Sequence, residues 1–128
     1  MINRLKWAVV SIALALTPLG SGATPVEFTA VDLHGQTHTL DDYRGKWVVI
    51  NYWATWCPPC LDEIPDLVDF HEQHKDHDGV VIGVNMESIP PARLLSFLES
   101  YLVSYPVVTD NQGGKGTALV GSVPGLPT

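Results

Sequence analysis

The segment from Trp47 to Cys60 constrains the fold more than any other part of this chain of 128 residues. It begins with a near-continuous apolar run, Trp47 to Trp53, of the kind that forms a strand buried on both faces of a sheet. The only two cysteines in the chain follow, in the sequence Trp56-Cys57-Pro58-Pro59-Cys60. Two prolines suit the first turn of a helix, where no backbone N–H is needed. We therefore expect a buried strand that turns directly into a helix at a pair of thiols.

The remaining pattern predicts strands and helices in alternation, which implies a parallel sheet with right-handed crossovers. Apolar residues make up 45% and charged residues 16% of the chain, which suits one packed domain. A net charge of −7 argues against nucleic acid or anionic lipid as a partner. The expected elements are a hairpin over Val26–Leu40 with its turn at His34–Gln36, a helix from near Cys57 to about His74, a strand over Val80–Asn85, a helix from Ala92 to about Tyr101 and a short strand over Val107–Thr109. The second helix should have Leu94, Leu95, Leu98 and Leu102 as its apolar side.

The first 23 residues have the layout of a secretory signal peptide. Arg4 and Lys6 precede an apolar stretch, Trp7–Leu16, and Ser21-Gly22-Ala23 offers small residues at the cleavage positions. We expect cleavage after Ala23 and a domain over residues 24–128; an uncleaved membrane anchor is the alternative. Either arrangement predicts a periplasmic or otherwise extracytoplasmic location.

The spacing of the thiols predicts unequal roles for them. Cys57 should lie at the helix N-terminus, where the macrodipole favours a thiolate, so it would attack a substrate disulfide. Cys60, one turn further, should be more buried and would resolve the mixed disulfide. Pro58 and Pro59 offer the thiolate no N–H donor, and acidic neighbours raise a thiol pKa, so we predict a reductant. Glu63 shares the helix side of Cys60 and could take its proton, although a solvated helix glutamate is the simpler interpretation of the spacing alone.

A group of three histidines gives only weak evidence for a metal site. His71, His74 and His77 recur every three residues, but they lack a clear fourth ligand. We interpret them as a solvated helix end and expect no metal and no other cofactor.

The segment Asn51–Pro65, with Gly83-Val84-Asn85 and Tyr105–Asp110 after it, resembles the exported thioredoxin-like reductases of the TlpA/ResA/CcmG group. The resemblance implies an α/β, thioredoxin-like fold with an added N-terminal β-hairpin. It identifies Cys57 and Cys60 as the redox-active disulfide and Glu63 as the group's active-site glutamate. Asn51 stands where thioredoxins carry a buried aspartate, so proton handling would pass to Glu63. The resemblance also implies that Trp56, Pro58, Leu126 and Pro127 contact substrate, with Pro127 as the cis-proline.

One departure from the group concerns the C-terminus. The group continues after the cis-proline with two strands and a helix, whereas this sequence stops at Thr128. The expected fold therefore lacks the final two strands and helix, and we expect the chain to be poorly stable or prone to aggregation when made alone.

Three functions compete at this stage. The first is an extracytoplasmic disulfide reductase whose substrates are exported proteins, with apocytochrome c as one candidate and a membrane thiol transporter as electron donor. The second is a peroxiredoxin-like peroxidase of the redoxin or AhpC/TSA type; its motif needs a threonine three residues before the cysteine, where this chain has Ala54, and a proline at Ile50. The third is a copper-binding module, which would need three residues between the cysteines instead of two.

Overall fold

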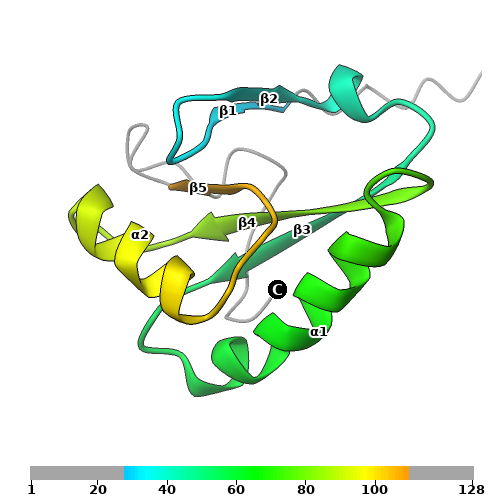
Figure 1. The fold of residues 1–128 in the computed structure, drawn as a ribbon. Helices are drawn as coiled ribbons and strands as arrows, with labels where there is room; N and C mark the ends of the chain where they lie inside the picture. Colours follow the sequence, from blue (N-terminus) through cyan, green and yellow to red (C-terminus); the bar gives the residue numbers. More distant parts are fainter. Residues whose placement is uncertain (1–27, 110–128) are drawn as a thin grey trace, which may run out of the picture.

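The computed structural model describes residues 28–109, which form two small sheets and two α-helices (Figure 1). The predicted signal peptide over residues 1–23 and the predicted substrate contacts Leu126 and Pro127 lie outside this range. An antiparallel hairpin joins β1 (Thr29–Val31) and β2 (Thr37–Thr39). A short 3-10 helix, η1 (Leu40–Tyr43), leads to the parallel sheet. That sheet has the strand order β3 (Trp47–Trp53), β4 (Gly79–Asn85), β5 (Val107–Thr109), and its crossovers contain α1 (Pro58–His74) and α2 (Pro91–Ser100).

The hairpin turn is built around one carboxylate. Asp32 Oδ1 accepts the backbone N–H groups of His34 and Gln36, each at 2.9 Å. Gly35 lies between them with φ +83°, a conformation that costs glycine little. The hairpin and its turn are therefore confirmed, with strands shorter than expected.

Buried polar contacts join the hairpin to η1. The imidazole of His38, which is buried, donates from Nε2 to Asp32 Oδ2 at 3.0 Å. Its Nδ1 lies 2.5 Å from the hydroxyl of Tyr43. Burial raises the pKa of Asp32, but the hydrogen bonds from His38, Gln36 and His34 outweigh it and leave that pKa below its ordinary value.

The central strand β4 separates two apolar layers. All seven of its residues are buried, and it pairs with β3 from Trp47↔Gly79 to Trp53↔Asn85. The helices cover one face and the hairpin covers the other (Figure 1). Gly83 accommodates this packing, since a Cβ there would come within 3.0 Å of the Tyr105 ring.

Two details differ from the sequence-based expectation. The strand β3 is buried only in its second half, and Trp47 is 79% exposed. The reason is that β3 is the edge strand of the described sheet, while α1 packs against β4. Leu102 does not belong to the apolar side of α2: the helix ends at Ser100, and Leu102 follows with φ +55° and 79% exposure.

Candidate redox site

The two cysteines form a disulfide at the start of α1. Cys57 is the N-cap residue, with extended backbone (φ −98°, ψ 99°), and its carbonyl accepts the N–H of Leu61 at 3.2 Å. Cys60 lies in the first turn, and the two Cα atoms are 5.3 Å apart. The expected passage from a strand, buried in its second half, through the pair into a helix is confirmed.

The disulfide is buried, and residues beside it in the sequence are exposed. Cys60 is 1% exposed and Cys57 is 4% exposed, so the difference has the expected sign but is small. Both belong to a buried cluster with Trp53, Val81 and Leu94. Trp56 is 69% exposed beside them, and Pro58 and Pro59 are also exposed. A partner that approaches the disulfide would thus meet a rim of flat, apolar side chains.

The first turn of α1 offers little stabilisation to an anion. The free N–H groups of a helix lie in its first turn, and here the first two positions are Pro58 and Pro59, which have none. The N–H of Cys57 is itself directed to Ala54 O at 3.2 Å. A Cys57 thiolate would therefore receive fewer donors than at an ordinary helix N-terminus.

Glu63 lies on α1 one turn after Cys60, and its side chain is exposed, as is that of Asp62. Cys57, Cys60 and Glu63 thus follow one another at intervals of three residues from the N-cap through the first two turns of α1. The predicted substrate contacts Leu126 and Pro127 lie outside the described residues.

Sequence reasoning missed a polar network behind the cysteines. Thr55 donates its backbone N–H to Glu87 Oε2 at 2.6 Å and its hydroxyl to Glu87 Oε1 at 3.0 Å. Asn85 Nδ2 donates to the same carboxylate at 3.1 Å. A signal was present, because Glu87 follows the strand next to β3 and the carboxyl ends of parallel strands meet at one edge of the sheet.

The three histidines do not converge. His71 is buried, and its Nδ1 accepts the N–H of Val81 at 3.1 Å. His74 Nδ1 lies 2.7 Å from Asp78 Oδ1, and His77 is exposed. Among residues 28–109, no group of three or more histidine, cysteine or acidic side chains is arranged to hold a metal.

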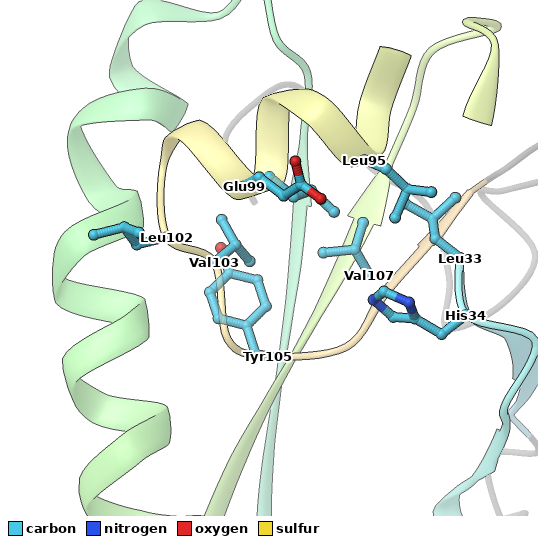
Figure 2. A pocket seen from close by; sticks show the side chains of 9 residues that line it. Leu33, His34, Leu95, Glu99, Leu102, Val103, Tyr105 and Val107 are labelled. Atoms are coloured by element: carbon cyan, nitrogen blue, oxygen red, sulfur yellow. The ribbon is translucent and has the colours of Figure 1, made fainter. Parts of the chain in front are cut away.

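A cavity of about 390 Å³ lies between the hairpin turn, α2 and β5 (Figure 2). Its lining is largely aliphatic, with His34 and Glu99 as charged or polar members. Burial raises the pKa of Tyr105, which also lines it, to about 12. No residue between Trp53 and Cys60 contributes to the lining, so the cavity is separate from the disulfide.

The architecture defines the class of the protein. A parallel sheet that leads into a Cys-Pro-Pro-Cys disulfide at a helix N-terminus, with a hairpin on the opposite face, is a thioredoxin-like fold. Residues 22–120 match the model of the AhpC/TSA family, and the chain belongs to that family. Within the described range, no helix is both long and apolar enough to cross a bilayer.

Named relatives refine this assignment and confirm the resemblance to the ResA group. The thiol-disulfide oxidoreductase ResA of Geobacillus kaustophilus is 35% identical over 96 residues, which cover 75% of this chain and 55% of that protein. A DsbF homologue from Corynebacterium diphtheriae aligns with TM-score 0.68 and 31% identity over 80% of this chain and 65% of that one. A secreted thiol-disulfide isomerase from Corynebacterium glutamicum gives TM-score 0.67 and 27% identity over 79% and 64%. The chain spans about half the length of the curated relatives it matches.

Proposed function

We propose that this chain is a thiol-disulfide oxidoreductase that works outside the cytosol and reduces disulfides of exported proteins through Cys57 and Cys60. One observation carries the proposal: a disulfide joins the N-cap and the first turn of α1. Relatives named thiol-disulfide oxidoreductases support the reaction class. The secreted isomerase among the similar structures supports the location.

The reaction begins with the dithiol form. The Cys57 thiolate attacks one sulfur of a substrate disulfide, which breaks that bond and forms a mixed disulfide while the other substrate sulfur leaves as a thiolate. The Cys60 thiol then loses its proton, and its sulfur attacks Cys57. The second substrate thiolate leaves, so the substrate gains two electrons and the protein becomes the disulfide. A separate thiol donor restores the dithiol.

We assign the proton of Cys60 to Glu63, which lies one helical turn away and faces solvent. A solvated carboxylate can pass a proton to water without a rearrangement of the core. Trp56 and Pro58 supply the exposed surface for the substrate chain around the bond, and Leu126 and Pro127 complete it in this proposal. Apocytochrome c is the proposed substrate and a membrane thiol transporter the proposed donor, as in the ResA-like group that the sequence resembles.

Insulin reduction tests the reaction class. The chain should accelerate the reduction of insulin by dithiothreitol, seen as faster precipitation of the released B chain. Cys57→Ala should abolish the acceleration. Cys60→Ala should instead trap a mixed disulfide with the substrate, which mass spectrometry detects. A rate equal to that of dithiothreitol alone would sink the proposal.

The match to the AhpC/TSA family favours one second candidate, a peroxidase. The described geometry argues against it, because the Thr55 hydroxyl donates to Glu87 and is not free to orient a peroxide. We therefore expect hydrogen peroxide consumption at the rate of a free thiol. Rapid peroxide consumption that depends on Cys57 would reverse the order of the two candidates.

A further inference from the structure

Glu87 connects the two strand ends that flank the disulfide. The segment that carries the chain from β3 to Cys57 is only three residues long, Ala54–Trp56, and we call it the redox loop. Glu87 lies on the connection between β4 and α2. Its carboxylate accepts both the backbone N–H and the hydroxyl of Thr55, at 2.6 and 3.0 Å. A side chain from another crossover thus holds the middle residue of the redox loop.

The carboxylate is itself held in place. Asn85 is fully buried at the end of β4. Its Nδ2 donates to Glu87 Oε2 at 3.1 Å, while its Oδ1 accepts the Glu87 backbone N–H at 3.0 Å. The N–H of Met86 donates to Trp53 O at 3.0 Å and continues the β3–β4 pairing by one step. Hydrogen bonds with Asn85 therefore hold both the backbone and the carboxylate of Glu87.

We infer that Glu87 is a positioning residue for the redox loop: through Thr55 it fixes the approach of Trp56 and Cys57 to a substrate disulfide. The inference rests on the proposed oxidoreductase function. Hydrogen bonds to a charged group are among the stronger ones in proteins, and two of them converge on one residue of a three-residue loop. A loop held in this way presents the attacking sulfur in a fixed direction, whereas a free loop would have to be ordered at each encounter.

The charge of Glu87 has a second effect. Its carboxylate contacts Thr55, two residues before Cys57, and nearby negative charge disfavours a thiolate. Loss of the charge should therefore make Cys57 easier to ionise even where the hydrogen bonds remain. Glu87 would in this way favour the disulfide form and a reducing protein.

The test separates geometry from charge with paired variants of the full chain. Glu87→Ala removes both, and Glu87→Gln keeps an acceptor but no charge. Thr55→Val removes the hydroxyl bond, and Thr55→Ser keeps it. Glu99→Gln, an exposed glutamate of α2, is the matched control.

The first readout is the single-turnover rate of insulin reduction by each reduced variant. Glu87→Ala should be slower by about tenfold, since a hydrogen bond to a charged group is commonly equivalent to a factor of ten or more. Thr55→Val should lose less, and Thr55→Ser and Glu99→Gln should match the parent chain.

The second readout needs no enzymatic activity. In a Cys60→Ala background, the pH dependence of alkylation of Cys57 by iodoacetamide gives its thiol pKa, which Glu87→Gln should lower and Glu99→Gln should not. If the parent chain fails to reduce insulin, the proposed function fails, while the alkylation profile still tests the effect of the Glu87 charge on Cys57. Unchanged alkylation profiles together with parent-like reduction rates in Glu87→Gln and Thr55→Val would overturn the inference. Should Glu87→Ala not fold, the Thr55→Val and Thr55→Ser pair gives the decision.

Discussion

Pro58 and Pro59 occupy the first two positions of α1, where an ordinary helix would carry two free N–H groups close to the Cys57 sulfur. Their presence leaves the thiolate short of donors, and this shortage favours the disulfide over the dithiol. The chain should for this reason be a reductant. In this proposal the direction of electron flow depends on two residues that take no part in bond making.

A histidine in this pair should reverse the bias. Pro59→His introduces a group that donates to the thiolate and can carry positive charge, so the Cys57 pKa should fall and the equilibrium with glutathione should shift toward the dithiol by at least about tenfold. Pro59→Ala restores only a backbone N–H and should shift it less. Equal shifts in both variants would show that the side chain is irrelevant.

Glu63 is the second residue whose role can be isolated. Glu63→Gln should slow release of reduced substrate, the step that needs a Cys60 thiolate, by about tenfold at pH 7; this is less than an enclosed base supplies, because the side chain is exposed. The defect should shrink toward pH 9, where the thiol ionises unaided. Accumulation of the mixed disulfide, followed by acid quench and mass spectrometry, measures it. Asp62→Asn, an exposed neighbour, should behave like the parent; a defect of the same size there would remove the assignment.

At this scale the sequence was informative only where the chemistry is local. Cys57, Cys60 and Glu63 lie within seven positions and on one helix, so spacing alone places them together. Thr55 and Glu87 are 32 positions apart, and their contact depends on strand register and on the rotamer that Asn85 imposes. Neither is encoded in a short motif.

A hydrogen bond between a side chain of α1 and the main chain of β4 links these two packed elements. The β4–β5 pairing begins only at Gly83, and the N–H of Val81 donates to His71 Nδ1. Because Nδ1 must accept, the imidazole is neutral in the folded protein. Burial lowers the pKa of His71 accordingly.

This bond predicts a dependence of stability on pH. An unfolded histidine takes up a proton near pH 6.5, whereas the folded His71 resists it, so the unfolded state binds more protons as pH falls. The contribution of His71 to the free energy of unfolding should be fully present above about pH 6.5. It should decline as pH falls from there toward the pKa of the folded His71. Thermal unfolding between pH 7.5 and 5.5 measures the decline. His71→Gln, whose amide oxygen can accept the same N–H, should flatten it; the exposed His77→Gln should not, and an unaltered slope in His71→Gln would contradict the assignment.

The elements themselves were largely predictable. Both α-helices, the hairpin and the three parallel strands follow from apolar periodicity and from turn residues such as Gly35 and the proline pairs. Exposure was harder to predict. The run Trp47–Trp53 is uniformly apolar, yet its first half faces solvent because β3 lies at the edge of the described sheet, and position in a sheet is not a property of the strand sequence.

At the scale of the whole molecule, the β3 edge of the described sheet favours self-association. Within the described range β3 pairs only with β4, and Trp47 and Val49 are exposed on it. Exposed apolar side chains on an edge strand favour association between copies. We therefore expect concentration-dependent self-association of the chain.

Trp47→Thr should reduce this association, measured by sedimentation velocity or light scattering over a range of concentrations. Leu102→Thr is a matched control, because Leu102 is equally exposed at 79% but lies outside the sheet. The two variants should differ clearly. Equal effects would mean that general surface hydrophobicity, and not the strand edge, drives association.

The contact between the hairpin and β5 also has a consequence for how the chain is made. Asp32 bridges to Val108, and the Leu33 N–H donates to Val107 O at 3.1 Å. The hairpin therefore acquires its neighbour only when residue 108 is available, 76 positions after residue 32. At the usual rate of protein synthesis, ~5–20 residues per second, about 4 to 15 seconds pass between the synthesis of residue 32 and that of residue 108. During this interval the apolar side of the hairpin is open to chaperones and to other nascent chains, so its fate depends on the surroundings of the ribosome as well as on the finished fold.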